Sequence, residues 1–172
     1  MQIRLKEIEA SQSIELHELA VKTFDETFAS QNTPKNMQWY FETTMTLENT
    51  KKELSNPDSY FYFALHHEQI IGYLKLNFNT AQTETVLENT AFEIERIYIK
   101  REFQGKGFGS KLFTTALNLG REKGYNQMWL GVWEHNNKAI HFYKKKGLKA
   151  FDQHNFQLGD DAQTDILMRL NF

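Results

Sequence analysis

The sequence contains no cysteine, only two prolines and no apolar stretch long enough to cross a membrane. Without cysteine the chain cannot form disulfides, bind zinc through thiolates or use a thiol nucleophile. A membrane helix needs about 20 consecutive apolar residues, and no segment reaches that length. The first ten residues carry four charged side chains and no apolar core, so we expect no signal peptide. These absences favour a cytoplasmic protein with no membrane partner.

The chain does have the composition of a folded domain. Of its 172 residues, 40% are hydrophobic and 14% are aromatic, which excludes a disordered chain. This length suits one core, so we expect residues 1–172 to form a single domain.

Charge is distributed unevenly along the chain, although the formal net charge is only −2. Residues 96–149 hold 12 Lys and Arg but three Glu, whereas the rest holds 8 basic and 19 acidic residues. One part therefore favours an anionic ligand and the other a cationic one. Two ordinary solvated surfaces would give the same pattern. We expect no nucleic-acid partner, because the whole chain is slightly acidic and no aromatic stripe accompanies the basic residues.

The hydrophobic periodicity predicts helices and strands mixed along the whole chain, which favours an α/β class. The helices are predicted over 13–28, from 34 through 41, and over 47–54, 107–123 and 136–146. The strands are predicted over 1–9, from 60 onwards, and over 70–78, 91–100, 128–133, 150–158 and 165–170, with a polar loop over 79–90.

The most informative segment is Gln104-Gly105-Lys106-Gly107-Phe108-Gly109, which joins a predicted strand to a predicted helix. Small residues let a backbone approach a ligand closely, and the unpaired amides of a helix start attract phosphate oxygens. A Rossmann fingerprint would need a third glycine at Ser110, and the spacing of a Walker A loop is absent. On this segment alone, a purely structural turn is the alternative.

A second motif runs from Asn136 to Leu148 and reads N-N-K-A-I-H-F-Y-K-K-K-G-L. Together the two motifs resemble those of the GCN5-related N-acetyltransferases, the GNAT superfamily. In that family Q/R-x-x-G-x-G/A binds the acyl-CoA pyrophosphate, and an N-x-x-A-(I/L)-x-(F/L)-Y-x-x-x-G-(F/L) element follows. Residues 91–148 carry the resemblance. Finer similarity over 93–100, 129–134 and 159–165 is to the PaiA-type spermine/spermidine N-acetyltransferases.

The resemblance implies an α/β (α+β) fold with a mixed, mostly antiparallel sheet of six or seven strands. Helices would cover both faces, and a central pair of strands would splay apart. It also implies acetyl-CoA as the cosubstrate, and without cysteine the acetyl group would pass directly to an amine. The residues implied in acetyl-CoA binding are Ile97, Tyr98, Ile99, Gln104, Gly105, Lys106, Gly107, Phe108, Gly109, Asn136, Tyr143 and Lys145.

Tyr143 matches the general acid of the family. The departing thiolate needs a proton, and a thiol pKa of about 8.5 is near enough to the tyrosine value of about 10 for transfer. Packing with Phe142 against the sheet is the alternative. Asn136 lies two helical turns earlier and can hydrogen-bond CoA or act as an N-cap, with Asn137 as the register alternative. Lys145 either meets a CoA phosphate or stays solvated.

The amine acceptor must lose a proton before it attacks, because an alkylammonium has a pKa of about 10. Glu93 and Glu95 lie two residues apart in the strand before the glycine-rich segment, so regular β geometry places them on one face. Carboxylates in this strand act as bases in several family members, which makes both candidates for the base or for binding a cationic substrate. Ion pairing with Arg96 or Lys100 is the alternative.

Trp39 and Tyr40 are candidates for the acceptor site, since aromatic rings bind alkylammonium groups, although core packing is the simpler interpretation. The histidines lack ligand spacing, so we predict no metal site. The expected acceptor is a polyamine such as spermidine or spermine. The alternatives are a protein N-terminal, lysine or other small-amine acetyltransferase, and a non-catalytic acyl-CoA-binding regulator. The resemblance also allows a homodimer.

Overall fold

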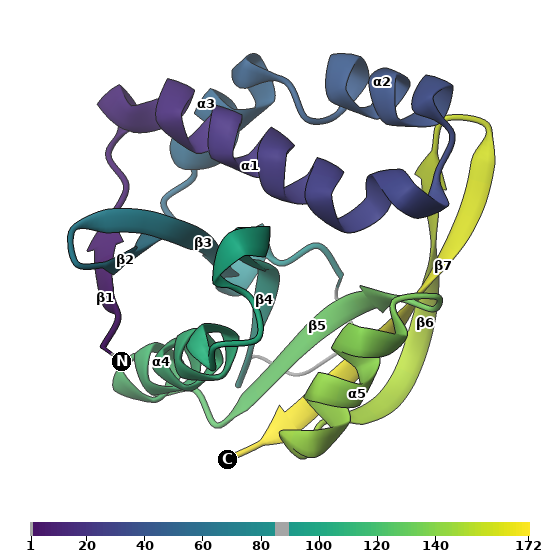
Figure 1. Cartoon of the computed structure of the whole chain (residues 1–172). Helices are drawn as coiled ribbons and strands as arrows, with labels where there is room; N and C mark the ends of the chain where they lie inside the picture. Colours follow the sequence, from purple (N-terminus) through teal and green to yellow (C-terminus); the bar gives the residue numbers. More distant parts are fainter. Residues whose placement is uncertain (1, 85–89) are drawn as a thin grey trace.

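The computed structural model describes residues 2–84 and 90–172, which form one seven-stranded sheet flanked by helices (Figure 1). The strands are β1 (Arg4–Glu7), β2 (Ser59–His66), β3 (Gln69–Asn77), β4 (Ala91–Ile99), β5 (Gln127–Trp133), β6 (Lys149–Leu158) and β7 (Asp161–Asn171). The α-helices are α1 (Ser13–Phe28), α2 (Pro34–Thr43), α3 (Leu47–Leu54), α4 (Phe108–Glu122) and α5 (Asn137–Lys145).

The strand order across the sheet is β1-β2-β3-β4-β5-β7-β6, and neighbours are antiparallel except at one place. That place is the centre, where β4 and β5 run parallel and α4 crosses between them. Only three residue pairs join these two strands in the described part of the chain: Ala91–Gln127, Phe92–Met128 and Glu93–Trp129. Beyond Glu93 the strands part, which divides the sheet into two halves.

Helices cover both faces of the sheet (Figure 1). On one face α4 and α5 pack on apolar side chains from the central strands, among them Leu74, Leu130 and Met168. On the other face α1 and α2 pack on Phe63 and Tyr73. Because apolar residues of α1 recur at helical spacing, a single stripe of that helix is buried.

The local signals explain where the helices begin. Thr33 caps α2 by accepting a hydrogen bond from the amide of Asn36 at 3.2 Å, and Pro34 occupies the first helical position. Helix α4 begins after Gly107, whose φ of 80° is in the left-handed region that glycine adopts freely.

The fold class predicted from the sequence is confirmed, including the seven strands, the helices on both faces and the splayed central pair. The last strand was wrongly placed over 165–170: β7 begins at Asp161, because Gly159 and Asp160 turn the chain directly from β6 into β7. Of the predicted polar loop, Asn79–Ala81 forms a 3₁₀ turn, while residues 85–89 lie outside the described residues, as does Met1 of the first predicted strand. No helix in the described ranges is long and apolar enough to span a membrane.

Candidate active site

A cavity of about 850 Å³ lies where β4 and β5 part. Its lining residues come from α1, α2, β4, the glycine-rich segment, β5, α5 and the hairpin of β6 and β7. From Glu93 to Ile99, every residue of β4 contributes to the lining. Backbone groups of β4 that would have faced β5 in a continuous sheet therefore border this space.

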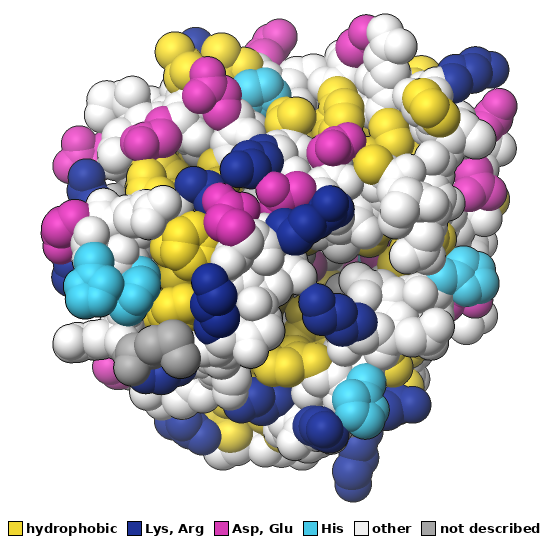
Figure 2. Space-filling model, in the orientation of Figure 1, with side chains coloured by type: hydrophobic (Ala, Val, Ile, Leu, Met, Phe, Trp, Pro, Cys, Tyr) yellow, Lys and Arg dark blue, Asp and Glu magenta, His cyan; other side chains and the backbone are white. Residues whose placement is uncertain are grey.

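The two charged regions of the sequence are also separated in space. On the face drawn in Figure 2, most Asp and Glu side chains lie in the upper half, over α1 to α3, whereas the lower half, near α4 and α5, shows Lys and Arg with few acidic side chains. The cavity is lined from both groups of helices, so an anionic and a cationic substrate can approach it from different sides.

The glycine-rich segment exposes the start of α4. Gly105 and Gly107 have φ values of 75° and 80°, and Gly107 at the N-cap provides no side-chain acceptor for the first-turn amides. Unpaired amides at a helix start carry partial positive charge and bind phosphate oxygens. The members of this segment that line the cavity are Gln104, Gly105, Gly107, Gly109 and Ser110.

Two side chains of this segment lie away from the cavity. Lys106 donates to the carbonyl of Glu102 at 2.9 Å, and the ring of Phe108 is buried in the core. The structure therefore leaves only backbone contacts to these two predicted binding residues. Gln104 donates to the carbonyl of Ile99 at 2.9 Å and accepts from Lys138 at 2.9 Å, so it links β4 to α5.

Tyr143 of α5 lines the cavity beside Ile97, Tyr98 and Ile99 of β4. Its ring packs near Phe113 with centroids 6.2 Å apart. Burial raises the pKa of Tyr143, so the hydroxyl is protonated at neutral pH. A protonated hydroxyl-bearing side chain therefore lines the cavity.

The other two predicted binding residues of this motif also line the cavity. Asn136 is the N-cap of α5, since its side-chain oxygen accepts from the amide of Ala139 at 3.2 Å. This is the alternative role considered for Asn136, and it leaves the amide NH₂ for a ligand. Lys145 is exposed at the end of α5.

Strand β4 departs from regular geometry at Glu95. Its pairing with β3 shifts by one residue, because Lys75 lies opposite Arg96 whereas Leu76 lies opposite Ile94. This β-bulge inserts Glu95 as an extra residue, so the expectation of regular alternation was wrong. Glu93 and Glu95 nevertheless point to the same side, where both contact the amide of Asn77.

Glu93 is a buried carboxylate, with 3% of its surface exposed. The amide and hydroxyl of Thr83 donate to it at 2.8 and 2.5 Å, and Asn77 donates at 3.0 Å. Burial and, to a lesser degree, the negative charge of Glu95 raise the pKa of Glu93 to about 7, against the lowering effect of these hydrogen bonds. A carboxylate in this range can exchange a proton at physiological pH.

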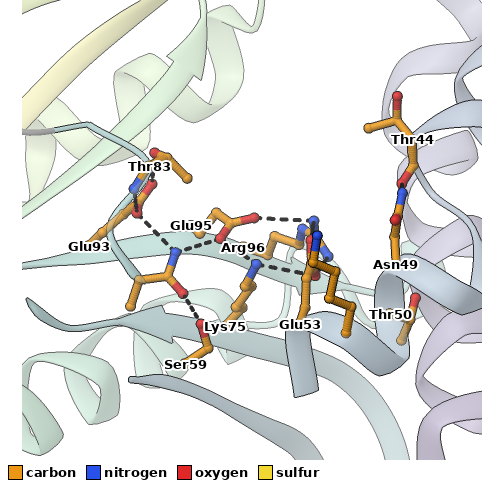
Figure 3. A network of polar contacts seen from close by, with 12 residues as sticks. Thr44, Asn49, Thr50, Glu53, Ser59, Lys75, Thr83, Glu93, Glu95 and Arg96 are labelled. Carbon is orange, nitrogen blue, oxygen red and sulfur yellow. Dashed lines mark hydrogen bonds and ion pairs between the residues drawn. The ribbon is translucent and has the colours of Figure 1, made fainter. Parts of the chain in front are cut away.

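Glu95 has a different surrounding, drawn in Figure 3. Its carboxylate lies 2.5 Å from the Lys75 ammonium and 3.1 Å from the Arg96 guanidinium, and Glu53 of α3 pairs with both cations. Burial alone would raise the pKa of Glu95, but Arg96 and Lys75 outweigh it and the net direction is down. Glu95 is therefore an ionised member of a buried ion cluster.

The cavity also has a wall formed by α2, β5 and the β6–β7 hairpin. Tyr40, Trp133 and Asp165 line it, and His154 lies 3.2 Å from Glu84 and 3.7 Å from Asp165. The indole N–H of Trp133 is buried without a hydrogen-bond partner in the described ranges.

Trp39 does not line the cavity. Its side chain is 42% exposed on the outside of α2, so the substrate contact predicted for it finds no geometric support. Tyr40, the next residue, does line the cavity and is buried against Phe24.

The residues that hold the two carboxylates were not predicted from the sequence. Lys75 and Asn77 are 4% and 1% exposed, and they alternate with Leu74 and Leu76 along β3. A polar residue at every second position of a strand bounded by aromatic residues was the available signal. For Glu53 no such signal exists, because a charged residue on a short helix ordinarily faces water.

Comparison with known proteins identifies the family. The model of the acetyltransferase (GNAT) family matches residues 14–148, so the chain belongs to this family. An N-acetyltransferase in the pepI 3′ region of Lactobacillus delbrueckii subsp. lactis, named as uncharacterized, is 44% identical over 148 residues, covering 86% of this chain and 85% of that protein. The spermidine N(1)-acetyltransferase of Thermoplasma acidophilum is 25% identical over 156 residues, or 88% and 91% of the two chains.

A solved structure shares the whole fold. The crystal structure of the PaiA N-acetyltransferase from Thermoplasma acidophilum in complex with coenzyme A superposes with a TM-score of 0.78 and 23% identity, covering 100% of both chains. The resemblance on which the predicted class depended is thereby confirmed. The chain is an N-acetyltransferase that uses acetyl-CoA.

Proposed function

We propose that this chain, acting as one domain, acetylates a primary amino group of a polyamine such as spermidine or spermine. The observation that carries the proposal is the cavity wall, where the carboxylates of Glu84, Glu93 and Asp165 occur together with the aromatic side chains of Tyr40 and Trp133. Carboxylates and aromatic rings both attract ammonium groups. The name of the spermidine acetyltransferase relative points to the same class of acceptor.

In this proposal the glycine-rich segment and the start of α4 hold the pyrophosphate of acetyl-CoA, which supplies the acetyl thioester. Backbone groups of Ile97, Tyr98 and Ile99 align the thioester and polarise its carbonyl. Asn136 and Lys145 contact other polar groups of the same molecule. These assignments are supported by the fact that residues of all these groups line the same cavity.

Glu93 is the proton acceptor in the proposed reaction. It takes a proton from the substrate ammonium, directly or through water, and the neutral nitrogen then forms a bond to the acetyl carbon as the carbon–sulfur bond breaks. The nitrogen releases its second proton to solvent, and Tyr143 donates a proton to the sulfur and is reprotonated from solvent. Glu95 is unsuited to accept the proton, because its ion pairs favour the ionised form.

An amine panel tests the acceptor class. The purified chain is given acetyl-CoA with spermidine, spermine, lysine or a peptide with a free N-terminus, and CoA release is followed with a thiol reagent. We expect at least tenfold higher kcat/KM for the polyamines. A preference for peptides or lysine would assign the chain to another acceptor class, and CoA binding without release for any amine would indicate a regulator.

The pH dependence tests Glu93. Since the base must be ionised, kcat/KM for spermidine should fall as pH drops below about 7, well separated from the amine titration near 10. Glu93→Gln should lower kcat/KM by about a hundredfold at pH 7.5. Glu84→Gln removes another cavity-lining carboxylate and should keep the same acid limb. An unchanged profile in Glu93→Gln would contradict the assignment.

A further inference from the structure

We propose that Asn77 is a positioning residue of this site: its amide, oriented by Ser59, joins Glu93 to Glu95 and keeps Glu93 available as the proton acceptor. The inference rests on the proposed function of Glu93. Nothing in the family motifs involves β3, which contributes Asn77, or β2, which contributes Ser59.

The side-chain amide of Asn77 bridges the two carboxylates. The nitrogen of Asn77 donates to Glu93 at 3.0 Å and to Glu95 at 2.5 Å, and an amide NH₂ has two hydrogens for these two acceptors. The oxygen of Asn77 accepts from the Ser59 hydroxyl at 2.9 Å. Ser59 therefore fixes which end of the amide faces the carboxylates, since the reverse orientation would place an oxygen against two anions.

The two carboxylates, which Figure 3 shows on one side of β4, have contrasting partners. Glu95 is paired with the cations Lys75 and Arg96. Among residues 2–84 and 90–172, Glu93 receives hydrogen bonds only from the neutral donors Asn77 and Thr83. One carboxylate is thus held ionised, whereas the other can gain and lose a proton, and Asn77 contacts both.

The sign of each effect follows from this arrangement. A hydrogen bond to the ionised form lowers the pKa of Glu93, so losing Asn77 should raise it. The negative charge of Glu95 raises the pKa of Glu93, so neutralising Glu95 should lower it. Charged and titratable groups on this side of the sheet include Glu53, Tyr73, Lys75, Glu95 and Arg96 in and beside the cluster, and Tyr40, Glu84, Tyr98, His154 and Asp165 around the cavity.

The experiment compares two variants whose effects have opposite signs. Asn77→Leu should move the acid limb of kcat/KM upward by about one pH unit, with activity partly recovered at pH 9. Glu95→Gln should move the same limb downward. A merely structural role would lower activity at every pH without moving the limb, and that result would overturn the inference.

Two further variants guard against misfolding and general destabilisation. Thr50→Val on α3 removes a partly buried hydrogen bond, from the hydroxyl of the buried Thr50 to the carbonyl of Thr46 at 3.0 Å, and should leave the acid limb in place. Ser59→Ala keeps Asn77 and only frees its orientation, so it should shift the limb in the same direction as Asn77→Leu by a smaller amount. If Asn77→Leu does not fold, the shift of the acid limb in Ser59→Ala tests the inference, and an unshifted limb would overturn it.

A readout without substrate separates this inference from the proposed function. The side-chain carboxyl signal of Glu93, labelled with ¹³C and assigned with Glu93→Gln, gives its titration midpoint by NMR. The midpoint should rise in Asn77→Leu and fall in Glu95→Gln even if no amine in the panel is acetylated. If the wild type is active but the titration midpoint of Glu93 is the same in the wild type, Asn77→Leu and Glu95→Gln, the role of Asn77 is disproved while the proposed function stands.

Discussion

The two faces of the central sheet are built from different side chains. Under α4 and α5, strands β3 and β4 present Leu74, Leu76 and Ile94 to an apolar core. On the side of α1 to α3, the same two strands bury Lys75 and Glu93. Asn77, Glu95 and Arg96 accompany them on that side.

This difference separates what the fold needs from what the proposed reaction needs. Buried charges cost free energy unless each has a partner, and a buried ion pair is often no more stabilising than an apolar replacement. An apolar second face would therefore serve the fold equally well. We infer that the ion cluster is retained because it supports two carboxylates with different protonation behaviour at the edge of the cavity.

The largest expected effect tests whether the two faces differ in their response to pH. Lys75→Met removes one of the two cations shared by Glu53 and Glu95, so that Arg96 alone faces two carboxylates, and we expect a loss of about 3–5 kcal/mol in unfolding free energy at pH 7. Leu130→Ala on the apolar face should cost about 2–5 kcal/mol.

Of these two variants, only Lys75→Met should lose an amount of unfolding free energy that depends on pH. The lowered pKa of Glu95 stabilises the wild type above the unfolded pKa of about 4.3, and this contribution disappears as pH falls. Lys75→Met removes part of it, so its cost should be smaller at pH 4 than at pH 7. Urea unfolding at both pH values measures the difference, and equal costs for Lys75→Met at both would refute the distinction between the faces.

A smaller effect tests whether the apolar side contributes chemistry through Tyr143. Tyr143→Phe should lower turnover at least tenfold, or about 1.4 kcal/mol, while the CoA dissociation constant stays within about twofold. Tyr125→Phe is a matched control, because Tyr125 lies outside the cavity lining and its hydroxyl bonds Asn79. Unchanged turnover in Tyr143→Phe, with the chemical step limiting, would exclude the general-acid role.

The smallest expected effect is on CoA affinity, and it is tested by substitutions at the two ends of α4. Gly107 and Gly124 have φ values of 80° and 87°, and a methyl group at either meets no atom within 4 Å. Replacing either by alanine should cost about 1 kcal/mol of stability, because both are left-handed. Only Gly107→Ala should weaken CoA binding, by about fivefold in calorimetry. Equal CoA affinity in both variants would argue against the glycine-rich segment as the pyrophosphate site.

Much of the fold could be predicted because its signals are local. The bounds predicted for α1 and α3 agree with the structure, since the apolar spacing and the turn residues that determine them lie within the helices and next to their ends. The splayed strands followed from the resemblance carried by two motifs. The start of β7 was wrong because residues 161–164 pair with the edge strand β6 and show little of the alternation that marks a strand.

The candidate site was predictable only in part. Tyr143 and the cavity-lining glycines follow from sequence motifs, but the roles of Glu93 and Glu95 depend on the bulge in β4 and on the pairing of β3 with it. Lys75 is a charged side chain, which ordinarily indicates a solvated position. Its burial results from partners brought in by α3 and β4, and such long-range pairing leaves no mark in the adjacent sequence.

The short pairing between β4 and β5, which comprises three residue pairs, also bears on the order in which the chain folds. Strands β1 to β4 form one antiparallel set from the first part of the chain, and β5 to β7 form another from the last part. Each set contains a hairpin of consecutive strands, β2–β3 in the first and β6–β7 in the second, whereas the pairing of β4 with β5 requires a parallel crossover through α4. We therefore expect the three residue pairs between β4 and β5 to form after these hairpins, so that the cavity beside them comes into existence late in folding.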